Sequence, residues 1–79
     1  MKFVVNITLK TGVLDPQGLA IKNSLSTLGF KNINKVKQGK LVEIDIDEDD
    51  SIIAKTTIAK MCEELLTNTV IEDYEITEK

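Results

Sequence analysis

The chain has 79 residues and a formal net charge of −3 at pH 7, with a sequence pI of about 4.8. This acidic balance argues against nucleic-acid binding, because neutralising phosphates needs a basic surface. No apolar run approaches the length of a membrane span. All ten basic residues are lysines and histidine is absent, so the usual general base near pH 7 and a plausible zinc site are both missing.

The sequence also lacks the patterns that carry catalysis or cofactor binding. It has no glycine-rich phosphate loop and no Ser/His or Cys/His pair. Cys62 is the only cysteine, so the chain has no internal disulfide, which suits a reducing compartment. We predict that Cys62 packs as a small buried hydrophobic residue. The opening residues are too soon polar for a signal peptide. We therefore expect one cytoplasmic domain over residues 1–79, without a catalytic, cofactor or metal site of its own.

The first half of the chain predicts a strand followed by a helix. Residues 2–9 alternate as in a half-buried strand, with these side chains inward: Phe3, Val5, Ile7 and Leu9. Asp15 is the expected N-cap of a helix over residues 15–28, and Pro16 suits its first position. The apolar stripe of that helix consists of Ile21, Leu25 and Leu28. Gly29 is the expected left-handed residue after its end.

The connection between these elements, Thr11 to Gly18, contains more residues with specific conformational preferences than a simple turn requires. Gly12 allows a positive-φ bend where the strand stops. Gly18 lies inside the first helical turn, where glycine costs about 1 kcal/mol relative to alanine. Something is therefore expected to pack closely against its backbone. A well-built turn and a partner-docking surface are the two interpretations, and we favour docking.

The second half predicts two strands, a helix and a final strand. Residues 33–37 form a short lysine-rich strand, Gln38 and Gly39 a tight hairpin, and residues 40–47 the next strand. Its inward side chains are Val42, Ile44 and Ile46. Asp49 or Asp50 caps a helix to about Leu66, whose apolar stripe is Ala54, Ile58, Met61 and Leu65. Residues 70–76 form the last strand, with Val70, Tyr74 and Ile76 inward.

The predicted order is β-α-β-β-α-β, an α+β ferredoxin-like sandwich with two helices on one face of an antiparallel sheet. The open face would show Val4, Thr8, Leu41 and Ile71. Scattered surface apolar residues and a subunit contact are equally good readings of that pattern. Lysines 35, 37 and 40 either protect a sheet edge from stray pairing or anchor an acidic partner.

Three segments together resemble one family. They are Leu9 to Gly18, Val36 to Glu43 and Met61 to Tyr74, and in order and spacing they are similar to the PurS family, the small subunit of phosphoribosylformylglycinamidine synthase. Thr11 and Thr69 stand where the family usually has proline. The resemblance covers essentially the whole chain and implies a PurS-like fold.

The resemblance implies a non-catalytic subunit in purine biosynthesis. PurS-like proteins join a synthetase and a glutaminase subunit and assist ammonia transfer during the ATP- and glutamine-dependent amidation of formylglycinamide ribonucleotide. ATP and Mg would bind the synthetase, and this chain would bind no cofactor. The candidate partner interface consists of Gly12, Val13, Leu14, Asp15, Pro16, Gln17, Gly18, Lys35, Lys37, Gly39 and Lys40. A stand-alone ACT-like ligand-sensing module is the alternative.

A homodimer or higher oligomer is also expected, because a core of this length is thin. Lys35 and Lys37 lie on one predicted edge strand, whereas the opposite edge carries Glu72, Asp73 and Glu75. Backbone pairing between the sheets of two protomers would bring these charges together. Whether the segment 33–37 is exchanged between protomers stays open at the level of sequence.

Overall fold

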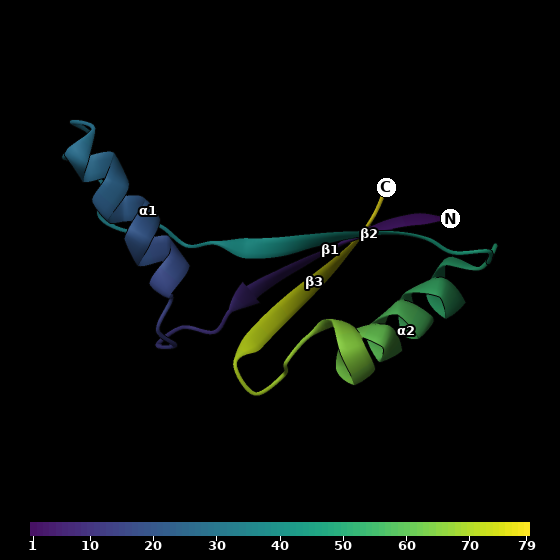
Figure 1. Cartoon of the computed structure of the whole chain (residues 1–79). Helices are drawn as coiled ribbons and strands as arrows, with labels where there is room; N and C mark the ends of the chain where they lie inside the picture. The colour runs from purple at the N-terminus through teal and green to yellow at the C-terminus, as the bar shows by residue number, and fades with distance from the viewer.

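A computed structural model describes all residues, 1–79, and its centre is an antiparallel three-stranded sheet (Figure 1). Strand β1 (Lys2–Leu9) lies between β2 (Gly39–Asp45) and β3 (Glu72–Glu78). Val5 pairs with Val42 on one side and Ile76 on the other. The alternation of apolar side chains along β1 thus continues across the sheet, so that one face is apolar.

Helix α2 (Ser51–Met61) covers that apolar face and continues into a π-helical turn, η1 (Cys62–Leu66). Asp50 is its N-cap, and its side chain accepts from the backbone N–H groups of Ile52 and Ile53. The fully buried core consists of Phe3, Val5, Ile7, Ala54, Ile58 and Cys62. The predictions that Asp50 caps this helix and that Cys62 is a buried hydrophobe are therefore confirmed.

The π-helical turn changes which side chains at the end of this helix face the core. A π-helical turn holds more residues than an α-helical one, so the apolar stripe shifts along the chain. Leu66 packs against the core, whereas Leu65 is 83% exposed. The inward placement predicted for Leu65 is wrong for this reason. It is also wrong for Val70, which precedes β3 and is 81% exposed.

Helix α1 (Pro16–Thr27) has the predicted caps. Asp15 accepts from the backbone N–H of Gly18, and Pro16 occupies the first turn. At the other end Gly29 has φ +106, while the N–H of Phe30 bonds to the carbonyl of Leu25 at 3.0 Å. These are the features of a Schellman motif. The helix predicted over residues 15–28 is confirmed.

The position of α1 differs from the prediction. Together with its flanking segments it forms an arm, residues 11–38, that projects away from the sheet, and the molecule measures 49 × 25 × 15 Å (Figure 1). The expectation of two helices on one sheet face is therefore wrong for the single chain, since only α2 covers it. Ile21 and Leu28, predicted to face inward, are exposed.

The predicted strand 33–37 and the hairpin at Gln38 and Gly39 are not formed either. Residues 31–38, called here the return segment, run back along α1 and continue directly into β2 without a turn. No residue from 31 to 37 makes a backbone–backbone hydrogen bond. A strand needs a neighbouring strand, and within one chain none is in reach. The α+β class, with an antiparallel sheet and two helices, is confirmed.

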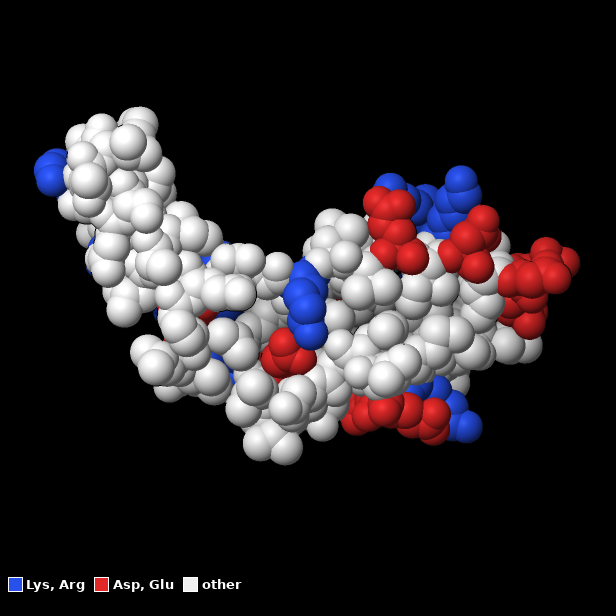
Figure 2. Space-filling model, in the orientation of Figure 1, with Lys and Arg blue, Asp and Glu red and all other residues white.

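The arm leaves large apolar side chains in solvent. Those that are exposed are Leu14, Leu19, Ile21, Leu28 and Phe30. Figure 2 shows the corresponding contrast: charged side chains gather over the sheet and α2, while the visible face of the arm is almost free of charge. Exposed apolar side chains gathered on one part of a small protein are typical of an interaction site.

Candidate functional site

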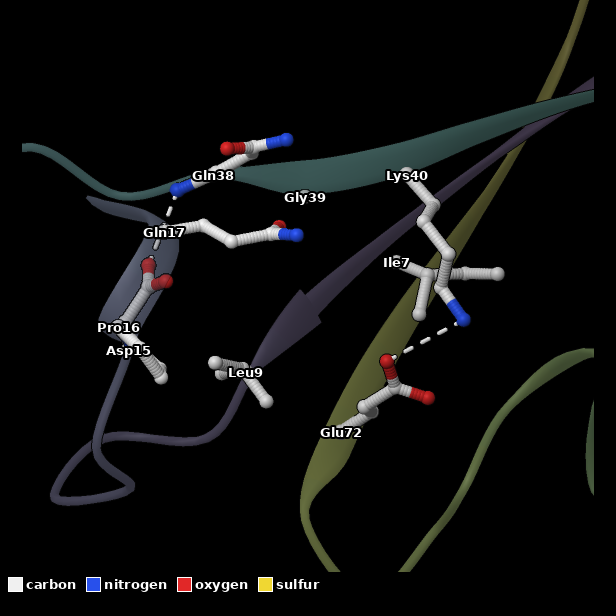
Figure 3. A pocket seen from close by; sticks show the side chains of 9 residues that line it. All are labelled: Ile7, Leu9, Asp15, Pro16, Gln17, Gln38, Gly39, Lys40 and Glu72. Atoms are coloured by element: carbon white, nitrogen blue, oxygen red, sulfur yellow. Dashed lines mark hydrogen bonds and ion pairs between the residues drawn. The ribbon is translucent and has the colours of Figure 1, made fainter. Parts of the chain in front are cut away.

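The site begins at the loop between β1 and α1, where one carboxylate holds the arm together. Gly12 makes the turn with φ +89, as predicted. Asp15 then uses both oxygens: Oδ1 accepts from the N–H of Gly18 at 2.9 Å and Oδ2 from the N–H of Gln38 at 3.1 Å. The residue that caps α1 therefore also fastens the return segment to its first turn. Figure 3 shows the second of these bonds.

Gly18 explains why the return segment can come so close. Gly18 is buried, and a Cβ there would collide with the carbonyl oxygen of Val36 and with the carboxylate of Asp15. Close packing against this glycine was predicted and is confirmed. The atoms that crowd it belong to the chain's own return segment and cap, so Gly18 is needed for the internal build of the arm.

The two hydrogen bonds lower the pKa of Asp15. Donation from Gly18 is the largest cause and donation from Gln38 the second, because both favour the charged carboxylate. A lowered pKa in the folded arm means that this contribution to stability is complete above the ordinary value of 3.8. It is lost as the pH falls through the folded-state pKa.

We therefore expect an acid-sensitive arm. The amide proton of Gln38 should shift in NMR spectra as the pH falls below 3.8, when Asp15 is protonated and stops accepting from it. In Asp15→Asn the side-chain carbonyl can still cap Gly18 but its NH2 group cannot accept from Gln38. The acid step should then be absent. Asp47→Asn is the control and should leave it unchanged; a step that persists in Asp15→Asn contradicts the assignment.

A hollow of about 380 Å³ lies in the angle between the arm and the sheet (Figure 3). Its lining residues are Ile7, Leu9, Asp15, Pro16, Gln17, Gln38, Gly39, Lys40 and Glu72. The floor of the hollow comes from the end of β1. Its walls come from the two ends of the arm, around Asp15 and Gln38, and from the start of β3. The hollow is open to solvent, and five of its lining residues are polar or charged, so it suits contact with another surface better than capture of a small molecule.

An ion pair crosses this hollow. Lys40 Nζ lies 3.3 Å from Glu72 Oε2, and the other oxygen of Glu72 accepts from the N–H of Asn68 at 2.8 Å. The backbone bond from Asn68 is the main reason that the pKa of Glu72 is lowered, and Lys40 adds to it. Nearby, Lys10 pairs with Asp73 at 2.7 Å. The ion pairs join the start of β3 to β2 and to the residue after β1, and the bond from Asn68 closes the loop before β3.

The structure brings only part of the predicted partner interface together. Asp15, Pro16, Gln17, Gly39 and Lys40 line the hollow. Gly12 and Leu14 are exposed beside it, Val13 is half-buried and Gly18 is buried. Lys35 and Lys37 lie farther along the return segment and line no part of it.

Sequence reasoning missed Ile7, Leu9, Gln38 and Glu72. Glu72 could have been found from pairing, because it lies opposite Leu9 at the end of the sheet. Gln38 could not have been found from the sequence, because it binds Asp15 through its backbone N–H, a group that every residue except proline has.

The chemistry available at this site is that of recognition. Burial raises the pKa of the Cys62 thiol, which is enclosed in the core and far less reactive as a thiol than as a thiolate. No group of three or more acidic or cysteine side chains is placed to hold a metal ion. Neither helix is long and apolar enough to cross a membrane. The exposed loop, the open hollow and the uncovered apolar side chains of the arm have the character of a contact surface.

Comparison with known proteins gives consistent matches along the whole chain. A family model described as PurS, phosphoribosylformylglycinamidine (FGAM) synthase, matches residues 2–79. The chain is 47% identical over 76 residues to the phosphoribosylformylglycinamidine synthase subunit PurS of Mycobacterium leprae, covering 94% of this chain and 90% of that protein. The corresponding protein of Methanocaldococcus jannaschii is 41% identical over 75 residues, covering 95% and 90%.

Solved structures agree with these matches. The crystal structure of Methanocaldococcus jannaschii PurS is similar with a TM-score of 0.88 at 43% identity, covering 99% of this chain and 95% of that one. A chain in the structure of PurLQS from Thermotoga maritima has a TM-score of 0.90 at 31% identity, with 99% and 95% covered. The arrangement of sheet, α2 and projecting arm is thus shared with solved proteins over nearly its whole length.

Proposed function

Because this chain belongs to the PurS family of phosphoribosylformylglycinamidine (FGAM) synthase subunits, we propose that it is the non-catalytic small subunit of that enzyme in de novo purine biosynthesis. The observation that carries the proposal is the family match over residues 2–79, which is nearly the whole length of the chain. The likeness to a chain of the Thermotoga maritima PurLQS structure supports a role inside a complex.

In this role all 79 residues act as one PurS-like domain in the cytoplasm, between a synthetase and a glutaminase subunit. The two large subunits supply the chemistry. Glutamine yields ammonia on the glutaminase, and the synthetase uses ATP with Mg. This chain assists the transfer by holding the two together. The absence of histidine from its sequence is consistent with this division of roles among the subunits. The exposed residues Gly12, Leu14, Pro16 and Gln17, beside the hollow, are the part of the predicted interface best placed to dock.

A second copy of the chain belongs to the same proposal. The fully buried core has only six residues, and the arm exposes apolar side chains that a single chain does not cover. Covering them with a second protomer would extend the thin core. The ACT-like alternative is not favoured, since the matches along the whole chain are to PurS proteins.

The test is reconstitution of the glutamine-dependent reaction from purified synthetase and glutaminase, with and without this chain. Alone, the chain should form no FGAM. Omitting it should reduce the glutamine-dependent rate to background, because ammonia released by one enzyme then reaches the other only through solvent. Replacing glutamine with ammonium chloride is the control and should make the rate much less dependent on the chain. Equal glutamine-dependent rates with and without the chain would reject the proposal.

A further inference from the structure

The connection from the end of η1 to the start of β3 exposes apolar side chains that the core does not use. Leu65 and Val70 are 83% and 81% exposed, and Ile71 is 38% exposed. Single exposed apolar side chains are ordinary on a protein surface, but three within seven residues form a patch that favours contact with another molecule. These three side chains are called here the apolar patch.

Hydrogen bonds within the chain fix the backbone that carries Val70. The carbonyl of Asn68 accepts from the N–H groups of Ile71 and Glu72 at 3.0 and 2.7 Å, and its side-chain oxygen accepts from the N–H of Val70 at 3.2 Å. The carboxylate of Glu72 accepts in turn from the N–H of Asn68 at 2.8 Å. A loop that is fixed in this way loses little further conformational entropy on binding, so Val70 is presented in a preorganised position.

The π-helical turn η1 places Leu65 in a similarly defined position. The N–H of Thr67 bonds to the carbonyl of Cys62, five residues earlier, at 3.0 Å. This geometry turns Leu66 toward the core and leaves Leu65 in solvent. Single π-helical turns are rare and occur frequently at functional sites. The outward direction of Leu65 is therefore set by the backbone.

The free charges next to the patch are acidic. Glu63 and Glu64 precede Leu65 directly and form no ion pair. The lysines at this end of the sheet, Lys10 and Lys40, are already paired with carboxylates of β3 at 2.7 and 3.3 Å. A complementary surface would thus be apolar at its centre and basic at its rim.

The patch is continuous with the loop that the proposed function uses for docking. The N–H of Lys10 donates to the carbonyl of Ile71 at 2.8 Å, and the N–H of Val13 donates to the carbonyl of Lys10 at 3.1 Å. The loop after β1 and the connection before β3 therefore lie side by side (Figure 1). Leu14 in the first of these loops is 75% exposed. One partner surface can cover both.

We propose that Leu65, Val70 and Ile71 form a preorganised anchor that inserts into an apolar pocket, rimmed by lysine or arginine side chains, on one of the two large subunits of FGAM synthase. The inference rests on the proposed function and adds to it a second contact beside the Asp15 loop. That function assigns the second copy of the chain to the arm, which leaves this patch to a large subunit.

The first experiment removes the apolar character of the anchor without changing its size much. Leu65→Gln with Val70→Thr should leave the melting temperature and the homodimer unchanged, because both side chains are exposed. Binding to the purified synthetase and to the purified glutaminase is measured separately by titration calorimetry. We expect the Kd for at least one of them to rise about tenfold or more. Ile52→Gln with Ile53→Thr, at the other end of α2, is the matched control and should bind like the native chain.

The second experiment tests the basic rim. Glu64→Lys should raise the Kd for the same large subunit at low salt and make binding less dependent on salt concentration than in the native chain. Asp47→Lys makes the same charge change at an exposed residue without an ion pair and should leave binding unchanged. Tighter binding by Glu64→Lys would overturn the proposed rim.

Native affinity of the Leu65→Gln, Val70→Thr variant for both large subunits overturns the inference. A weakened homodimer also overturns it, because the patch would then contact the second copy. In glutamine-dependent FGAM synthesis the variant should recover the native rate when its concentration is raised, since only binding is impaired. If the native chain supports this reaction while the variant binds normally, the inference alone fails. If the native chain does not support it, the proposed function fails.

Discussion

Ile58→Ala is expected to lower the free energy of unfolding by about 2–5 kcal/mol, because it removes a fully buried side chain and leaves a cavity. Ile58 lies at the centre of a core of only six residues. A domain this small has a stability of only a few kcal/mol, so the variant should be largely unfolded at 37 °C. Urea denaturation at a fixed protomer concentration measures the loss, since dimerisation adds to apparent stability.

Ile52→Ala provides the matched control. Ile52 lies on the same helix but is 78% exposed, so the same truncation should change the free energy of unfolding by no more than about 0.5 kcal/mol. A similar loss in both variants would mean that α2 does not pack on the sheet through Ile58. A larger loss for Ile52 would place the exposed side of α2 in a further interface.

Gly18→Leu is expected to detach the return segment from α1. The new side chain would occupy the space of the Val36 carbonyl, at a cost of about 1–3 kcal/mol that outweighs the gain in helix propensity of about 1 kcal/mol. The arm should loosen while the core around Ile58 stays folded. Loosening of the arm should be visible by NMR as loss of the hydrogen bond from the Gln38 amide to Asp15. A weaker dimer and weaker binding to the synthetase subunit should follow.

Ala20→Leu is the control for Gly18→Leu, because it places the same side chain two residues later at an exposed position. It should leave the arm and the Gln38 amide unchanged. A Gly18→Leu protein that folds and dimerises normally but does not bind the synthetase would instead place the partner at Gly18 itself. One that assembles with native affinity would show that nothing crowds this glycine.

Much of the local structure could be predicted because its chemistry is local. Asp15 and Asp50 cap helices through their own carboxylates, and Gly29 ends α1 because glycine readily adopts its positive φ. The alternation along β1 identified the three core residues Phe3, Val5 and Ile7. Each of these depends on residues within a few positions of one another, which a reading of periodicity and caps captures.

The candidate site was predicted less completely because it depends on contacts between distant segments. The loop at Asp15 was identified, but not that its second oxygen binds the N–H of Gln38, 23 residues away. Close packing at Gly18 was expected, yet the packing atom is a backbone carbonyl of the return segment. Backbone groups carry no residue-specific signal, so only the folded arrangement reveals which of them meet.

By itself, the sequence determined the α+β class, the family, the helix caps and the core side of β1. Only the tertiary structure decided where the arm goes. Residues 33–37 form no strand in the single chain, because β2 follows them without a turn and they cannot fold back onto their own sheet. Strand pairing requires a second strand at hydrogen-bonding distance, and that condition is set by the path of the whole chain.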